Sequence, residues 1–298
     1  MDVMEKLESL AKNSIELSIG FGEDGRYKKG GTRIGGPADL PEDFVWPTCE
    51  GEYYSETEKS VVENRPLSFL AQFNCEEMAS FDTDHLLPDH GLLSFFYAKD
   101  YLGHTVDPKA KGSARVYWFE DISALSAAEY PADMKDEFLT PMVPVEMGSV
   151  RTYPFQDDYV KVFPDVPDLF DDGEDLYEDF CDEFEEAWND LMESESFNQL
   201  LGWPVVFQNM MFDCCELAAQ GYSLSDAPSE IRQRAEDSAH ERWQLLFQLE
   251  IGALEGGPIL LLDDGWIGDG SVISFYIAKE DLAARRFDRV WMYVQIPY

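Results

Sequence analysis

The sequence predicts a mainly β protein of the α+β class, built from duplicated antiparallel β-roll or sheet units with a few peripheral helices. Three observations support this. Aromatic and β-branched residues gather in short runs that end at Gly, Pro or Asp, as strands do. Similar runs recur in the same order in both halves of the chain. Strands alternating with long helices, the pattern of a parallel doubly wound sheet, are not found.

The internal repeat is clearest in two pairs of blocks. Residues 94–102 (SFFYAKDYL) match residues 274–282 (SFYIAKEDL). Further downstream, residues 115–119 (RVYWF) match residues 289–293 (RVWMY). Matches in one order at similar spacing indicate two copies of one structural unit.

Two further matches lie upstream of these blocks. Gln72 in LSFLAQF and Gln248 in WQLLFQL occupy equivalent positions in otherwise apolar strands. A fainter match aligns residues 35–37 with residues 202–204. A buried amide must be hydrogen-bonded, so the repeated glutamine indicates a shared structural role.

These matches predict the domain organisation. We expect a single domain over residues 1–298, with two repeats at about 30–125 and 198–298. An acidic helical insert at about 126–197 would join them.

The chain is strongly acidic, with 22 Lys+Arg against 60 Asp+Glu and a formal charge of −38. This charge argues against binding to nucleic acid and against attraction to an anionic membrane surface. It permits a basic protein partner. Apolar residues make up 45% of the chain, which excludes a disordered acidic tail.

The charge is densest in the middle segment. Residues 165–195 contain 15 acidic residues and no Lys or Arg. Apolar residues nevertheless recur there at steps of three and four, which predicts an amphipathic helix capped by Asp171 or Asp172. The candidate partner-binding carboxylates on its polar face are Asp172, Glu178, Asp182, Glu185 and Glu186.

Three other segments have some helical character. An N-terminal helix is expected over Val3–Ser14, and a more mixed helix over Ser229–His240. The stretch Phe207–Ala218 fits a helix or a strand equally well.

The N-terminus and the cysteines indicate a cytoplasmic protein. The chain starts without a signal-peptide pattern, and its apolar runs are too short to cross a membrane. The five cysteines lack CxxC spacing, so reduced thiols are expected rather than a disulfide framework or structural zinc. The adjacent Cys214 and Cys215 are expected to behave as small apolar residues.

No catalytic or metal-binding motif is present. The sequence has no GxSxG elbow and no HExxH spacing among its four histidines. The acidic run at residues 263–270 does not fit an EF-hand loop, and a hairpin turn explains it better. We therefore expect no metal, no cofactor and no catalytic residue that sequence can identify.

Four residues in turn-like segments are candidates for binding a ligand. Arg33 lies in a glycine-rich run, where it either pairs with a carboxylate of the protein or binds an anionic ligand. The ion pair is the favoured interpretation. The set comprises Arg33, Trp46, Trp266 and Asp269.

The repeated blocks resemble the YwqG-like family, catalogued as DUF1963, a bacterial domain of unknown function. The similarity covers nearly the whole chain outside about 125–195. Where that family often has a histidine before the Leu-Leu-Gly block, this chain has Asn198. The matching motifs are RIGGP (33–37), LP (40–41), WP (46–47), PLSFLAQF (66–73), LP (87–88), GLLSFF (91–96), LLGWP (200–204), LLFQ (245–248), Trp266, GDG (268–270), DL (281–282) and FDRVW (287–291).

The resemblance implies a soluble, cytoplasmic β-roll and brings no established activity. Members of such families sometimes lie beside toxin genes, which implies an immunity or accessory role. We therefore expect a non-enzymatic interaction module for a basic partner such as a toxin domain. The alternative is a binding protein or enzyme for a sugar or an anionic metabolite, with its site between the two repeats.

Overall fold

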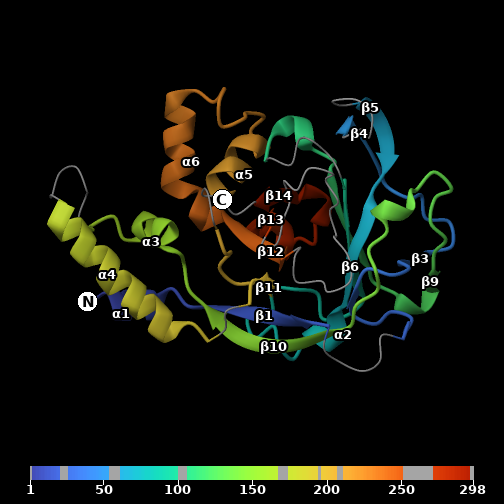
Figure 1. Ribbon diagram of the computed structural model, residues 1–298, viewed down its shortest axis with the longest axis horizontal. Coiled ribbons are helices and arrows are strands. Elements are labelled where there is room, and N and C mark those ends of the chain that lie inside the picture. The colour runs from blue at the N-terminus through green and yellow to red at the C-terminus, as the bar shows by residue number, and fades with distance from the viewer. Residues whose placement is uncertain are drawn as a thin grey trace.

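The protein is mainly β, and all of its strand pairs are antiparallel, which confirms the predicted fold class (Figure 1). Helices lie at the periphery of the sheets. The computed structural model describes residues 2–20, 26–53, 61–99, 106–166, 174–193, 196–206, 211–250 and 271–295.

Two main sheets form the framework. The larger has six strands, in the order β10 (Val145–Thr152), β1 (Lys12–Ile19), β11 (Gln199–Leu201), β12 (Trp243–Glu250), β13 (Val272–Ala278) and β14 (Trp291–Gln295). The smaller has four, in the order β2 (Arg33–Ile34), β6 (Ser68–Asn74), β7 (Leu92–Tyr97) and β8 (Ala114–Phe119).

The remaining strands form two pairs. These are β3 (Asp39–Pro41) with β9 (Leu125–Ala127), and β4 (Thr48–Tyr53) with β5 (Val61–Pro66). The α-helices are α1 (Val3–Ser9), α2 (Cys75–Met78), α3 (Gln156–Val162), α4 (Glu174–Leu191), α5 (Met211–Ala219), α6 (Ser229–Arg242) and α7 (Lys279–Ala283). Short 3₁₀ helices are η1 (Pro108–Ala110), η2 (Ile122–Ala124), η3 (Asp136–Phe138) and η5 (Phe287–Arg289).

An aromatic cluster joins the two main sheets. Phe73 and Phe95 of the smaller sheet pack on Phe247 and Phe275 of the larger, with ring centroids 4.9–5.2 Å apart across the interface. All four side chains are fully buried. The two halves of the chain therefore share one core, with edge-to-face and tilted ring packing.

The helices are distributed unevenly around this core. In Figure 1, α4, α3 and α1 lie together at one end of the longest axis, and α5 and α6 cover the strands of the second half. The smaller sheet and the β3–β9 pair lie toward the other end. The acidic helix is thus remote from the smaller sheet.

The central strand pairs of the two halves share local irregularities. The β6–β7 ladder shifts register between Phe69 and Ala71, and the β12–β13 ladder shifts between Leu245 and Phe247. Each shift lies just before the glutamine that the two halves share. These parallels accord with two copies of one unit, although the duplication itself stays a prediction.

The first shared glutamine bridges three segments of the first half. Gln72 is fully buried, and its Oε1 accepts from the Asp39 N–H at 3.1 Å. Its Nε2 donates to the Gly31 carbonyl at 2.9 Å. The amide therefore holds the chain on both sides of β2 against the central strand.

The second glutamine does the same in the second half. Gln248 Oε1 accepts from the Val205 N–H at 3.1 Å, and its Nε2 donates to the Phe197 carbonyl at 3.1 Å. Ser274 Oγ, on the neighbouring strand, also donates to Gln248 Oε1 at 3.3 Å. Both glutamine side chains therefore hydrogen-bond to the backbone of neighbouring loops.

Strand pairing corrects the alignment of the glycine-rich segments by one residue. Arg33 pairs with Gln72, and Gln199 pairs with Gln248, so residues 35–36 correspond to 201–202. All four of those residues have positive φ, between +59° and +76°. The leucine at 201 holds a backbone conformation that glycine adopts more readily.

The N-terminal helix is shorter than the sequence pattern predicts. Helix α1 ends at Ser9, and β1 begins at Lys12, so the prediction of helix through Ser14 is wrong. From Ser14 onward apolar residues alternate with polar ones, and Ile15 and Leu17 are fully buried. This period of two belongs to a strand.

The middle segment contains more than helices. Strand β10 lies within the expected helical insert and pairs with β1 along eight residues. The helix expected between residues 165 and 195 corresponds to α4, and the one expected over Ser229–His240 corresponds to α6. The stretch that fitted either structure contains α5.

Candidate functional site

Arg33 forms a buried ion pair. It is 4% exposed, and its Nη1 lies 3.1 Å from Asp39 Oδ2. Nη1 also donates to the carbonyls of Lys28 and Gly31, both at 3.3 Å, and Nη2 donates to the Pro37 carbonyl. The favoured ion-pair interpretation of Arg33 therefore has a specific partner.

Asp39 collects hydrogen bonds from several segments. It accepts from the Tyr27 hydroxyl at 2.6 Å, the Gly30 N–H at 2.8 Å and Gln72 Nε2 at 2.7 Å. Burial opposes ionisation, but these bonds and the Arg33 charge outweigh it and hold the pKa of Asp39 below its usual value. The carboxylate is therefore ionised at neutral pH, and the hydrogen-bond donors of this loop converge on it.

The second half replaces this charged pair with neutral groups. Gln199, at the position of Arg33, donates from Nε2 to the Trp203 carbonyl at 2.7 Å. Val205 takes the position of Asp39 in the hydrogen bond to the central glutamine. Gln248 therefore makes its two backbone hydrogen bonds beside neutral side chains, without a buried ion pair.

Trp46 is engaged in contacts within the protein. Its Nε1 donates to the Leu67 carbonyl at 2.8 Å. Its ring contacts Phe96 and Tyr130 with centroids 5.4 and 5.8 Å away. Trp46 packs on the smaller sheet, and the other two ligand candidates, Trp266 and Asp269, lie outside the described residues.

An open groove of about 1040 Å³ lies beside the Arg33 network, between the smaller sheet and β10. Arg26, Lys28 and Arg33 line it, together with Glu77 and Glu146. Trp46 is not one of its lining residues. Arg33 therefore reaches a groove lined by the first half and the middle segment rather than by the two repeats, and without the aromatic partner that the sequence suggested.

Helix α4 presents a dense acidic face. Glu178, Asp182, Glu185 and Glu186 are all exposed, and Asp172 lies outside the described residues. Within the described part of the chain, none of these four carboxylates has a Lys or Arg within 4.0 Å. Among the described side chains, the acidic face comprises Glu178, Asp179, Asp182, Glu183, Glu185, Glu186 and Asp190.

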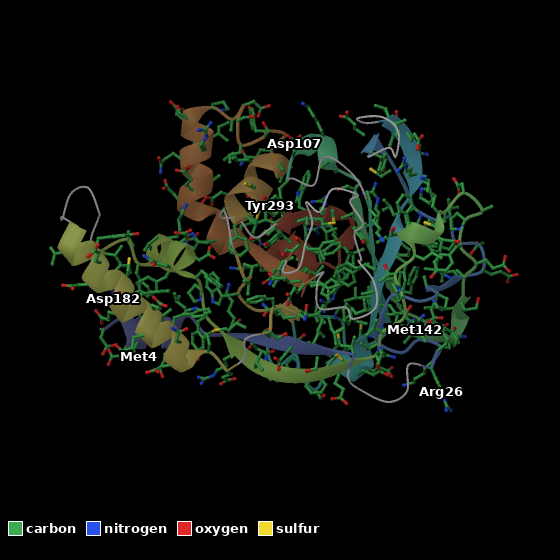
Figure 2. The ribbon with its side chains drawn as sticks, in the orientation of Figure 1. Met4, Arg26, Asp107, Met142, Asp182 and Tyr293 are labelled. Carbon is green, nitrogen blue, oxygen red and sulfur yellow. The ribbon has the colours of Figure 1, made fainter. Side chains whose placement is uncertain are left out.

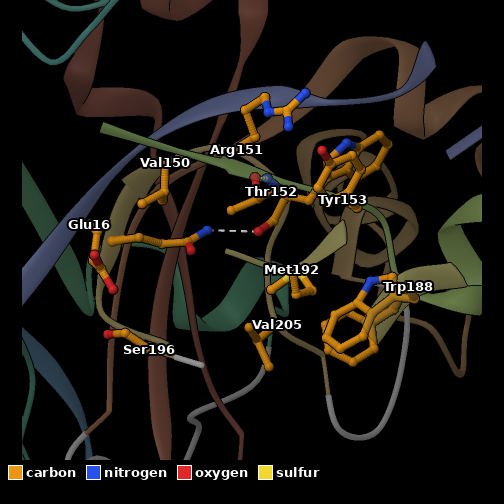
Figure 3. Close-up of a pocket in the computed structure, with 12 residues that line it drawn as sticks. Glu16, Val150, Arg151, Thr152, Tyr153, Trp188, Met192, Ser196 and Val205 are labelled. Atoms are coloured by element: carbon orange, nitrogen blue, oxygen red, sulfur yellow. Dashed lines mark hydrogen bonds between the residues drawn. The ribbon is translucent and has the colours of Figure 1, made fainter. Parts of the chain in front are cut away.

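The opposite face of α4 is firmly docked. Phe184 packs on Tyr159 of α3 with ring centroids 5.2 Å apart, and Phe180 and Ala187 are buried beside it. At the end of the helix, Trp188 faces β10 residues such as Thr152 across a cavity of about 10 Å³ (Figure 3). That volume accommodates at most one water molecule, so this cavity is a packing feature.

A buried polar cluster near the start of β1 escaped the sequence analysis. The Lys12 amine is buried 3.3 Å above the Trp203 ring and has no hydrogen-bond partner among the described residues. Burial, reinforced by repulsion from Lys279, lowers its pKa to about 7. Burial likewise raises the pKa of Asp158, on α3, to about 7, although Lys12 opposes that shift.

Other polar groups surround this pair. The Tyr276 hydroxyl and His240 Nδ1 are buried without partners in the part of the chain that the structure describes. Lys161 has partners, because its Nζ lies 3.2 Å from Asp213 Oδ2 and donates to the Glu236 carbonyl. No sequence motif marks these residues, since they come from β1, α3, α5, α6 and β13.

The adjacent cysteines are not activated. Burial raises the pKa of Cys214 to about 11 and that of Cys215 well above its ordinary value. Thiolates are the reactive species, so both side chains behave as small apolar groups at neutral pH.

The described residues contain neither a metal-binding cluster nor a membrane-spanning helix. No group of three or more His, Cys, Asp or Glu side chains is placed to hold a metal ion. No helix in those ranges is long and apolar enough to span a bilayer.

Comparison with known proteins identifies one family. A family model described as "Domain of unknown function (DUF1963)" matches residues 32–295. The match includes Arg33 and α4 and excludes Lys12. No curated protein matches the chain.

The Arg33–Asp39 pair can be tested by importing the neutral arrangement. Asp39→Val leaves Arg33 buried without a counter-charge, which we expect to lower the free energy of unfolding by about 3–5 kcal/mol. Adding Arg33→Gln recreates the Gln199/Val205 pair and should recover about 2 kcal/mol of that loss. Urea denaturation of the two single variants and the double variant measures this coupling, and additive losses would contradict it.

The buried Lys12 amine predicts a pH-dependent stability. Because its pKa falls from 10.5 to about 7 on folding, its penalty is complete below pH 7 and disappears as the pH rises toward 10.5. At about pH 6 Asp158 is largely protonated, so Lys12→Met should raise the free energy of unfolding by about 2 kcal/mol. The gain should vanish near pH 10.

Thermal and urea unfolding across this pH range provide the measurement. Lys111→Met is the matched control, because Lys111 is exposed. A gain in the Lys12 variant that is independent of pH would show that packing, rather than the charge, is responsible.

Proposed function

The chain belongs to the DUF1963 family, a domain of unknown function, and we propose that it is a non-enzymatic binding protein that captures a basic partner on the acidic face of α4. The observation that carries this proposal is the set of exposed carboxylates on one helix that have no Lys or Arg counter-ion among the described residues.

These carboxylates lower the stability of the helix that carries them. Like charges at positions i and i+4, such as Glu178 with Asp182 and Asp182 with Glu186, repel one another along the helix surface. Asp190 in the last turn also opposes the helix dipole, and no basic residue offsets it there. A surface that costs stability and makes no internal ion pair is typical of a binding surface.

The position of α4 favours access by a large partner. Asp182 and Met4 lie at one end of the long axis, whereas Arg26 and Met142 of the groove lie toward the other (Figure 2). The helix is held by its apolar face, so its carboxylates keep a fixed spacing. A fixed acidic surface speeds the encounter with a basic protein and makes binding sensitive to salt.

The cell compartment belongs to the same proposal. All five cysteines are free, as expected for a reduced cytoplasm. Neutralising a basic toxin domain, as an immunity or accessory protein, would use this surface without any catalytic group.

A second candidate is the binding of an anionic metabolite or a sugar phosphate in the open groove beside the Arg33 network, which is lined by the first half and by β10 with the residues just before it. Its support is the convergence of Arg26, Lys28 and Arg33 on one surface of a chain with few basic residues. Arg33 pairs with Asp39, and Lys28 pairs with Glu77 at 2.8 Å, so an anion would have to compete with Glu77 for the Lys28 amine.

The acidic-face proposal is tested by neutralising four carboxylates of α4. Glu178→Gln, Asp182→Asn, Glu185→Gln and Glu186→Gln together should weaken capture of a basic protein from native lysate by at least about tenfold at low salt. Wild-type capture should itself decline between about 50 and 500 mM salt. Pull-down with quantitative mass spectrometry gives both readouts.

The control variant changes the same number of exposed acids elsewhere. It combines Glu42→Gln, Asp43→Asn, Glu129→Gln and Asp133→Asn, away from α4. Equal loss in the two variants would show that net charge alone matters. The absence of any basic partner at either salt concentration would remove the proposal.

The groove has its own test. If it binds anions, inorganic phosphate or a sugar phosphate at about 10 mM should raise the melting temperature of the protein, and Lys28→Gln should reduce that shift. Lys111→Gln, at an exposed site outside the groove, is the control. Equal shifts in all three proteins would exclude binding at the groove.

A further inference from the structure

A cavity of about 240 Å³ lies where the two halves of the chain meet. The segment that follows α2 in the first half supplies most of its lining, and Arg285, just after α7, comes from the second half. Its polar lining residues are Asp82, His85, Asp89 and Arg285, and its apolar ones include Met78 and Leu87.

Backbone strain is concentrated at this cavity. Among the described residues, three non-glycine residues have positive φ, and two of them, His85 at +53° and Arg285 at +58°, line it. The left-handed region disfavours side chains with a Cβ, so each conformation costs free energy. Such strain persists where the surrounding structure holds it in place, and it gathers at ligand sites.

Arg285 contacts both halves of the chain and has N–H groups that its three hydrogen bonds do not use. Its guanidinium donates to the carbonyls of Leu86 and Leu87 in the first half, and to that of Leu282 in its own. A guanidinium carries five N–H groups, and these bonds use three of them. The two remaining N–H groups are available to a carboxylate.

Asp82 provides an acceptor of the opposite charge. Its side chain is 3% exposed, and its Oδ2 accepts from the Leu87 N–H at 2.7 Å. Its Oδ1 is buried and has no hydrogen-bond partner in the described ranges. A buried carboxylate oxygen without a donor is costly, so a donor on a ligand would be favoured there.

We propose that this cavity binds a free α-amino acid. The ammonium group of the ligand donates to Oδ1 of Asp82, and the carboxylate of the ligand accepts from the remaining N–H groups of Arg285. The ligand side chain lies along Met78 and Leu87. The buried Asp82 and the Arg285 guanidinium match a zwitterion better than they match a simple amine or a simple acid, and the second carboxylate of the lining, Asp89, is exposed and pairs with His90.

This site is independent of the acidic face of α4, because no residue of α4 lines it. Its ligand would contact the first half through Asp82 and the second through Arg285. Binding would therefore stabilise the junction between the halves, which makes thermal stability a direct readout.

The first experiment compares three kinds of probe by thermal shift and calorimetry. L-amino acids of small and medium size should raise the melting temperature, with measurable affinity at millimolar concentration or below. Propylamine and propionate, which each lack one charged group, should bind at least about tenfold more weakly, a difference of about 1.4 kcal/mol. No response to any amino acid, or equal responses to all three kinds of probe, would overturn the proposal.

Variants locate the binding. Asp82→Asn preserves the shape and an acceptor for the Leu87 N–H but removes the charge, and it should reduce amino-acid affinity at least about tenfold. Asp84→Asn, in the same segment but outside the cavity lining, should bind as the wild type does. Unchanged affinity in Asp82→Asn would overturn the site.

A third variant uses the strain itself. Glycine adopts a φ near +53° without penalty, so His85→Gly should raise the melting temperature of the unliganded protein. Because the folded state is then more stable, weaker amino-acid binding in this variant reflects the lost imidazole. Unchanged affinity would exclude a role for His85 in the site.

Discussion

The hydrogen bonds of two buried glutamines organise the rest of this structure. Gln72 and Gln248 each bind one N–H and one carbonyl of a neighbouring segment. An unpaired buried amide is expensive, so each glutamine restricts where that segment can lie. Both strands also contribute phenylalanines to the shared core, and the amide bonds thereby fix the glycine-rich loops relative to that core.

The two halves use this framework differently. The first half adds the Arg33–Asp39 ion pair, whereas the second places Gln199 and Val205 at the same points. The ion pair gives Arg33 a structural role, although Arg33 also lines a groove together with other basic residues. The same loop thus contains the buried ion pair and lines the groove. Gln72 helps to position it by donating a hydrogen bond to Asp39.

The charged features lie away from the shared core. The acidic face belongs to a helix at the end of the long axis, and the strained cavity lies at a junction of loops. The core tolerates few changes because it is closely packed, whereas peripheral segments can carry unpaired charge or strained backbone at moderate cost. Some charge is nevertheless buried, because the Arg33–Asp39 pair bonds to Gln72 and the Lys12 amine lies beside the indole of Trp203.

Sequence alone determined the local patterns of this protein: aromatic strands, the steps of three and four in α4, the repeated glutamine and the family motifs. Each of these depends on neighbours a few residues apart. Tertiary structure alone decided that Arg33 pairs with Asp39, that Lys12 is buried, and that Asp82 and Arg285 line one cavity. Such relations depend on which strands pair and in which register, and a non-local pairing leaves no periodic signal in the chain.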